Sequence, residues 1–390
     1  MRSSRVKKNL SVLLPDGESV FAIPVLRCLS QSPEVRTHIL SSDPWDPIRF
    51  SKYRTHFFGK REKGQEELMA AIYNTVKERD VDVILPVDEQ AIRLLSIHGA
   101  ALSHFAAIAP VPNTEAFDIA ADKWLFADWV KEHKIPHPPT ILYQPDTGFE
   151  QRLADLQFPV LIKPTRGGYG RGIKFFETPA ALLRFFEERG CPEDFIIQSF
   201  IRGYDIDCSV LCHEGIVSAY TIQRGFIEPY HRFASPAGIE FLYDKGVHDV
   251  VSRLVRTLNW SGIAHLDLRY DERDHQVKII EMNPRFWGSL LGSLVAGVNF
   301  PRLACFAALR ENFPSIEYQH KRFVSGKAAT RMLTKGFLRP KRTGVDFNST
   351  SLSFIIKDPL PEVVEFSLSL MRKITRSVGH SRQGQLTYGK

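Results

Sequence analysis

The chain has 390 residues, of which 43% are hydrophobic and 24% are charged, a composition typical of a folded globular protein and not of a disordered or fibrous one. Lysine and arginine outnumber aspartate and glutamate by 51 to 44, a net charge of +7, with the excess concentrated toward the two ends. No nucleic-acid-binding motif accompanies this charge and no apolar run reaches the roughly 18 residues that cross a bilayer, so neither nucleic-acid binding nor a transmembrane segment is expected.

Residues 1–115 alternate between strand-like and helix-like segments. Strands are predicted at 10–14, 37–40, 81–86 and 105–108. Helices are predicted between them at 20–29, 65–79 and 89–97. This alternation predicts an N-terminal doubly wound parallel α/β domain.

The regular alternation of strands and helices ends after residue 115. Helices are predicted within 113–139, and a proline-rich boundary ends that stretch. From 161 to 282 strands dominate, with one helix predicted at 179–189, and another helix follows at 297–310. We therefore expect a second, α+β domain over 116–320 and a basic appendage over 321–390. The helix predicted at 361–376 is interpreted as a packing helix, with weak peripheral membrane contact as the alternative.

The five cysteines, at 28, 191, 208, 212 and 305, lack the paired spacing of a zinc site. Cys208 and Cys212 fall in an apolar strand-like segment, so buried free thiols are expected. Free thiols favour a reducing, cytoplasmic location.

Two acidic strand ends are the most informative feature. Asp267 lies on an alternating strand at 262–270, and Glu281, Asn283 and Arg285 alternate at the end of the next strand. If the two strands pair as a hairpin, Asp267 and Glu281 can share a cation, and hard oxygen ligands suit Mg²⁺. A solvent-facing hairpin with ordinary surface charges is the alternative.

A glycine-rich turn between two strands, at 158–176, is interpreted as a phosphate-gripping loop. Glycines at 167, 168, 170 and 172 allow backbone N–H groups to approach an anion closely, and Lys163 ends the preceding strand. The segment is neither a Walker A loop nor a Rossmann fingerprint, because a strand follows the glycines. A flexible hairpin turn is the alternative.

Two further segments carry weaker signals. Main chain beside Gln198 is suited to an adenine edge and Asp205 to ribose hydroxyls, although a surface hairpin also explains this segment. Lys123 starts a helical segment and, taken alone, is an ordinary solvated lysine.

Together and in this order, these segments resemble the ATP-grasp superfamily. The matching pieces are Asp122-Lys123, the strand and glycine loop at 159–172, Ile197-Gln198 with Gly203-Tyr204-Asp205, Asp267, and the run from Glu281 to Arg285. The resemblance implies a pre-ATP-grasp domain at 1–115 followed by a two-lobed ATP-grasp fold at 116–320. The small lobe is expected at about 140–200 and the large lobe at about 201–320.

The resemblance also implies a role for each matched residue. Lys123 and Lys163 would contact the phosphates of ATP, and Gly167, Gly168, Tyr169, Gly170 and Gly172 would close over them. Gln198 and Ile201 would border the adenine and Asp205 the ribose. Asp267, Glu281 and Asn283 would hold Mg²⁺, with Mn²⁺ as a substitute. Arg285 and Lys163 would be the catalytic residues that offset charge on the transferred phosphoryl group.

The activity implied is that of an ATP-dependent ligase, which activates a small carboxylate as an acylphosphate and joins it to an amine. Carboxyphosphate or carbamoyl-phosphate chemistry and a non-catalytic ATP-binding subunit are the alternatives, and a homo-oligomer is left open. Segments 86–89 and 288–301 resemble the carbamoyl-phosphate-synthase-like group. Candidate acceptor residues, for which a surface-loop role is equally open, are Gln223, Arg224, Glu228, His231, Arg232, His265 and Arg269.

Overall fold

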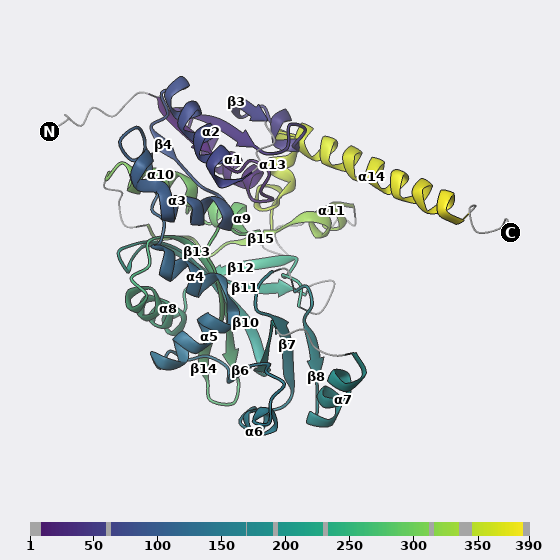
Figure 1. Cartoon of the computed structure of the whole chain (residues 1–390). Coiled ribbons are helices and arrows are strands. Elements are labelled where there is room, and N and C mark those ends of the chain that lie inside the picture. The colour runs from purple at the N-terminus through teal and green to yellow at the C-terminus, as the bar shows by residue number, and fades with distance from the viewer. Residues whose placement is uncertain are drawn as a thin grey trace.

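The computed structural model describes residues 9–59, 64–168, 170–189, 194–228, 233–311, 316–334 and 345–384. In Figure 1 a parallel sheet lies at the top, a large antiparallel sheet in the middle and a smaller antiparallel sheet at the bottom. The long C-terminal helix extends sideways from the top. This arrangement confirms the predicted fold class, an α/β domain followed by a two-lobed α+β fold.

The first sheet has five parallel strands in the order β3-β2-β1-β4-β5. They are β1 (Leu10–Leu14), β2 (Val35–Ser41), β3 (Arg54–Gly59), β4 (Val83–Ile84) and β5 (Ala107–Ile108), with helices α1 (Ala22–Leu29), α2 (Gln65–Glu78) and α3 (Glu89–Leu102). Only β3 was not predicted, because its partly exposed residues show no apolar alternation. The chain order reverses between β1 and β4, and open α/β sheets bind ligands at the carboxyl ends of such strands.

The large sheet has six strands in the order β14-β13-β10-β11-β12-β15. They are β10 (Gly203–His213), β11 (Ile216–Ile227), β12 (Gly238–Leu242), β13 (Gly262–Asp271), β14 (Gln276–Asn283) and β15 (Arg322–Val324). Helices α4 (Thr114–Ala121), α5 (Lys123–Glu132) and α8 (Lys245–Thr257) share an apolar core with one face of this sheet. That leaves the opposite face of β10, β13 and β14 for polar side chains.

The small sheet has the order β6-β9-β7-β8 and is antiparallel. Its strands are β6 (Thr140–Leu142), β7 (Val160–Pro164), β8 (Lys174–Phe176) and β9 (Phe195–Ser199). Helices α6 (Phe149–Ala154) and α7 (Pro179–Arg189) complete its core. The glycine loop connects β7 to β8, as the sequence predicted.

Two expectations need correction. Helix α8 falls within the stretch expected to hold only one helix, because its β-branched valines gave it the appearance of a strand. Its buried residues, Val247, Val251, Leu254 and Val255, nevertheless have helical spacing. In addition, β15 pairs with β12, so the segment expected to be an appendage begins inside the large sheet.

The C-terminal segment returns to the first sheet through α11 (Gly326–Thr334), η2 (Phe347–Ser349), α13 (Leu352–Lys357) and α14 (Leu360–Gly384). The buried carboxylate of Asp358 accepts hydrogen bonds from Ser51 Oγ at 2.6 Å and Lys52 N at 2.9 Å. These bonds fix the start of α14 against the N-terminal domain. Among the described helices, none combines the length and apolar character needed to cross a bilayer.

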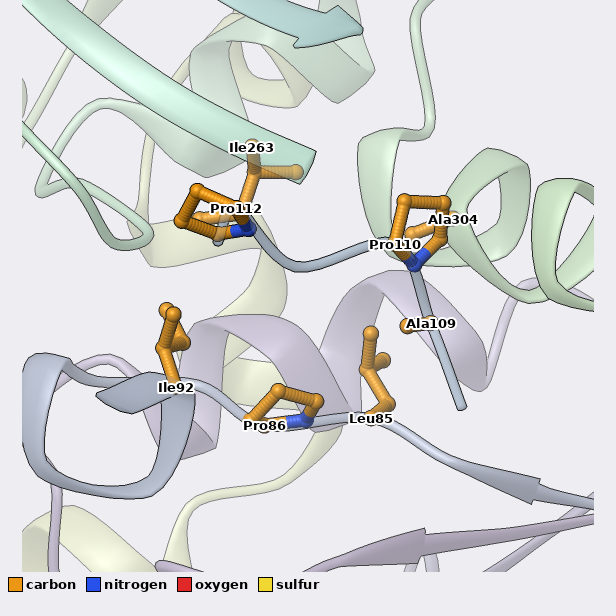
Figure 2. A pocket seen from close by; sticks show the side chains of 8 residues that line it. All are labelled: Leu85, Pro86, Ile92, Ala109, Pro110, Pro112, Ile263 and Ala304. Carbon is orange, nitrogen blue, oxygen red and sulfur yellow. The ribbon is translucent and has the colours of Figure 1, made fainter. Parts of the chain in front are cut away.

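One apolar core joins the first sheet to the large sheet. It includes Val12 of β1 and Leu26 of α1. From the other side it includes Phe286 and Trp287, which precede α9 (Leu290–Val295), and Phe300, the first residue of α10 (Phe300–Ala308). Figure 2 shows a cavity at this junction, with Leu85, Pro86 and Ile92 facing Ile263. The cavity holds about 10 Å³, roughly one water, so it is a packing gap and not a substrate site.

Candidate active site

Three carboxylates lie side by side on the polar face of the large sheet. Asp207 of β10 is directly opposite Asp267 of β13, and Asp267 is directly opposite Glu281 of β14. This register confirms the predicted hairpin pairing of Asp267 with Glu281. Since alternate residues of a strand share a face, His265 and Asn283 form the neighbouring row.

Burial and mutual repulsion shift the pKa values of these carboxyl groups. Burial raises the pKa of Asp267 well above its ordinary value, and the neighbouring Glu281 and Asp207 raise it further. Burial also acts to raise the pKa of Glu281, but Lys123 and Lys163 outweigh it and hold this pKa below its ordinary value. Like charges directly opposite one another destabilise a sheet, so the row favours positive charge beside it.

The two predicted lysines supply part of that charge. Lys163, on β7, is buried and donates a hydrogen bond from Nζ to Gln198 Oε1 at 2.8 Å. Burial lowers the pKa of Lys163, and Glu281 opposes this shift. Lys123, the first residue of α5, donates from Nζ to the carbonyl oxygen of Gly167 at 2.6 Å and lies 3.4 Å from Glu281 Oε2.

The glycine loop lies beside the same side chains. Gly167, Gly170 and Gly172 have positive φ angles of 104°, 69° and 77°. A Cβ atom at Gly170 would approach the Phe233 carbonyl oxygen to 2.6 Å, so a side chain there is excluded by space as well as by backbone conformation. A Cβ atom at Gly168 would lie 3.5 Å from Arg285 Nη2. Tyr169, the remaining loop residue of the prediction, lies outside the described residues.

Arg285 connects the carboxylate rows to the N-terminal domain. Its Nη2 donates to Asn283 Oδ1 at 3.0 Å, and its Nε donates to Glu89 Oε1, at the start of α3, at 3.1 Å. Its guanidinium also lies 4.7 Å from the ring centroid of Phe21. The carboxyl ends of β1 and β4, where an open α/β sheet binds ligands, therefore face the predicted metal site.

The residues predicted around the nucleotide form hydrogen bonds and an ion pair with neighbouring side chains and main chain. Gln198 donates from Nε2 to Thr140 Oγ1 at 3.0 Å, so its side chain orients Lys163 within the small lobe. Asp205 forms an ion pair with Arg269, and Arg269 Nε also donates to the carbonyl oxygen of the buried Ile201 at 2.8 Å. Arg269, a candidate for the acceptor site, is therefore held beside the predicted ribose residue.

Of the other acceptor candidates, Gln223 and His265 adjoin the carboxylates. Gln223 donates to Asp207 Oδ2 at 3.3 Å, and His265 Nε2 lies 3.3 Å from Asp267 Oδ1. Arg224 is paired with Glu240 at 2.7 Å. Glu228 is exposed, and His231 and Arg232 lie outside the described residues.

The sequence interpretation missed Asp207 and Glu89 as site residues. Asp207 offers an oxygen within 4.8 Å of ligand atoms of His265 and Asp267. Asp207 follows the predicted Asp205 by two residues, and alternate residues of a strand share a face, so a signal for Asp207 was available. Glu89 approaches Arg285 only through contact between segments far apart in the chain.

The four described cysteines, Cys28, Cys208, Cys212 and Cys305, are buried free thiols, as expected. Burial raises the pKa of Cys208 and Cys212, which disfavours the reactive thiolate. Cys191 lies outside the described residues. These thiols are packing residues and do not contribute a nucleophile to the site.

Comparison with known proteins identifies the same region. Residues 120–289 match the model of an ATP-grasp domain family. The chain is 23% identical to a D-aspartate ligase of Enterococcus faecium over 77% of each protein. It is also 27% identical to a carbamoyl-phosphate synthase of Methanobrevibacter smithii, over 48% of this chain and 52% of that one, so it spans about half the length of that relative.

The fold resembles that of a solved structure as well. N5-carboxyaminoimidazole synthetase from Staphylococcus aureus, crystallised with ADP, superposes with a TM-score of 0.65 at 15% identity, covering 88% of this chain and 91% of that chain. The ordered motifs, the two-lobed fold and the family match agree with one another. Residues 120–289 of this chain therefore match an ATP-grasp domain family, in the part of the fold that carries the carboxylate row.

Proposed function

We propose that this protein is an ATP-dependent ligase that activates a small carboxylate by phosphorylation and joins it to an amine, releasing ADP and phosphate. The observation that carries the proposal is the row of Asp207, Asp267 and Glu281, which is faced by Lys123 and Lys163. The relatives support this class of reaction, and the likeness to D-aspartate ligase supports an amino acid as one substrate.

The nucleotide is proposed to bind between the two lobes. Lys123, Lys163 and the glycine loop at 167–172 would contact its phosphates, since these groups already meet beside Glu281. Main chain at 198–201 would border the adenine, and Asp205 would accept hydrogen bonds from the ribose. Binding at this position requires Asp205 to share or release its ion pair with Arg269.

The donor set fits Mg²⁺. Asp267, Glu281 and Asn283 offer carboxylate and amide oxygens, the hard ligands that Mg²⁺ prefers, and Asn283 Oδ1 keeps a second lone pair beside its hydrogen bond to Arg285. When bound, Mg²⁺ would neutralise charge on the nucleotide phosphates. Mn²⁺ has a compatible preference for oxygen ligands and is proposed as a substitute.

The protein's contribution to the reaction is positioning and charge. A substrate carboxylate beside Arg285 would be held in line with the γ-phosphate, and its oxygen would attack phosphorus to give an acylphosphate and ADP. The amine nitrogen would then attack the acyl carbon, and phosphate would leave. Lys163 and Arg285 would offset the charge that spreads over the phosphoryl oxygens, so no serine or cysteine nucleophile is needed.

The likeness to carbamoyl-phosphate synthase favours a second candidate, in which bicarbonate is the carboxylate. A screen of carboxylates and amines for ADP release, with bicarbonate as a separate arm and mass spectrometry of the products, distinguishes the two. The proposed ligase releases ADP over many turnovers only with an acid and an amine together, and it gives a product lighter than their sum by one water. ADP release that depends on bicarbonate alone supports the second candidate. Nucleotide binding without turnover in any arm indicates a non-catalytic subunit.

The domain division near residue 115, an ATP-grasp domain that extends past residue 320 to include β15, and the cytoplasmic location are parts of the same proposal. The continuous core between the first and large sheets supports a junction near 115 that does not hinge freely. The buried free cysteines support a reducing compartment.

Asp207→Asn is expected to weaken Mn²⁺ binding, measured in the presence of a non-hydrolysable ATP analogue, by about tenfold or more. The reason is that Asp207 directly faces Asp267, and removing one carboxylate typically weakens a metal site by this order even when it lies in an outer shell. Electron paramagnetic resonance of free Mn²⁺ measures the change. Asp274→Asn, at the turn of the β13–β14 hairpin, is the charge-matched control. Equal Mn²⁺ affinity in the two variants would exclude Asp207 from the site.

Glu89→Gln is expected to lower the rate of ADP formation by about tenfold while leaving affinity for the ATP analogue unchanged. Glu89 orients Arg285 through a charged hydrogen bond of 3.1 Å, and such bonds are worth about 1.5–3 kcal/mol. Asp118→Asn, which breaks the surface pair with Arg93, is the control. A loss of nucleotide affinity instead of turnover would contradict a positioning role for Glu89.

A further inference from the structure

The C-terminal helix α14 exposes an apolar stripe on the side that faces away from the protein. Pro361 is buried, Glu362 is paired with Arg27 at 2.7 Å, and the first turns pack against η1 (Pro47–Phe50). On the other side, Val363, Phe366 and Leu370 are 56%, 71% and 49% exposed. Their spacing of three and four residues places them along one stripe.

A helix that rests on a globular protein normally buries its apolar stripe against that protein. Helix α14 buries Pro361 and partly buries Val364 and Leu368, but it exposes a second apolar stripe as well. Leu360 and Met371 widen the exposed apolar surface, at 54% and 57% exposure. In Figure 1 α14 extends beyond the rest of the described chain, in yellow at the upper right, and no described segment lies along its outer part. A contiguous exposed apolar surface of this kind is typical of an interaction site.

The charge of α14 identifies the type of partner. The helix contains two acidic residues, one of which is paired with Arg27, and four basic residues, Arg372, Lys373, Arg376 and Arg382. An apolar stripe with a basic end is the pattern of helices that lie in the interface of an anionic membrane.

Pairing with a second copy of α14 fits the sequence less well. The spacing of Val363, Phe366 and Leu370 continues to Lys373 and Ser377, so a seam between two helices would be interrupted by a charge after two turns. A lipid surface tolerates the same pattern, because a lysine at its edge can extend its ammonium group toward the headgroups. The apolar surface is also broader than the narrow seam of a helix pair.

We propose that α14 docks this protein on an anionic lipid surface, with Val363, Phe366 and Leu370 inserted at the level of the headgroups and the basic end of the helix directed to the same surface. This is peripheral attachment, and it would bring the ligase site to a membrane without a spanning segment. It develops the peripheral membrane contact that the sequence left open as the alternative to a packing helix. The inference stands independently of the proposed reaction, because it rests on surfaces outside the ligase site.

Co-sedimentation of the full chain with lipid vesicles tests it. Wild-type protein is expected to bind vesicles containing phosphatidylserine several-fold more than vesicles of phosphatidylcholine alone, and added salt should weaken this binding. The double variant Phe366→Ser, Leu370→Ser is expected to lose most of the binding. Ile216→Ser, which removes an equally exposed apolar side chain from β11, is the matched control and should bind as wild type.

Two results would overturn the proposal. One is equal binding of the wild type and the double variant to phosphatidylserine vesicles. The other is absence of vesicle binding together with a wild-type dimer, seen by sedimentation velocity, that the double variant abolishes, which would assign the stripe to a second copy of the chain. Wild-type affinity of the double variant for nucleotide would show that the variant is folded. If the wild type proves to have no ligase activity, the vesicle experiment still tests the membrane proposal.

Discussion

Replacing Glu281 with glutamine is expected to lower the rate of ADP formation by about 10²–10³-fold, equivalent to about 2.7–4 kcal/mol of barrier. The amide keeps the shape of the side chain but removes the charge that faces Asp267 and lies 3.4 Å from Lys123. Without it, the predicted metal site loses a central ligand. ADP formation at saturating Mg²⁺ and ATP measures the change, and the melting temperature should stay close to that of the wild type.

Glu272→Gln is the matched control for this variant. Glu272 lies in the loop of the same hairpin and is exposed, so its substitution removes an equal charge without touching the carboxylate row. Wild-type turnover is expected. If Glu281→Gln turns over ATP as fast as Glu272→Gln, the assignment of the row as the metal site is wrong.

Lys163→Met is expected to reduce ATP turnover to a similar extent. The buried ammonium group is held by Gln198 and points toward the carboxylate row, where it would offset charge on the transferred phosphoryl group. Methionine keeps the length of the side chain, so packing in the small lobe should persist. Because burying a charge opposes folding, the melting temperature of this variant is expected to change little.

Two companion variants sharpen the result. Lys163→Arg should not restore turnover, because a planar guanidinium does not fit a buried site shaped for a compact ammonium group. Lys174→Met, at the exposed first residue of β8, should behave as wild type. Recovery of activity in Lys163→Arg would show that general positive charge is sufficient and that Lys163 has no specific contact with the phosphates.

Local patterns were enough to predict most elements that form the site. The alternation around Asp267 and Glu281 predicted two strands with their acidic residues on one face, and the pairing register confirms both. Lys163 at the end of a buried strand and Lys123 at the start of a helix were likewise predicted. These features depend only on the periodicity of neighbouring residues, which the sequence displays directly.

Contacts between distant segments were not predictable in this way. Glu89 and Arg285 are separated by 196 residues, and no local pattern indicates that α3 faces the end of β14. The main chain beside Gln198 is predicted to border the adenine, but no local pattern indicates that the Gln198 side chain forms a buried bridge between Lys163 and Thr140. The outward orientation of α14 likewise depends on Arg27 and Asp358, which fix its first turn from outside the helix.

The most direct test of the proposed ligase follows an oxygen atom. Once the screen has identified an acid and an amine, the carboxylate is labelled with ¹⁸O and the phosphate released in one reaction is analysed by mass spectrometry. Activation as an acylphosphate predicts that each phosphate carries one ¹⁸O atom from the carboxylate. Release of unlabelled phosphate, or of AMP with pyrophosphate, would contradict the account.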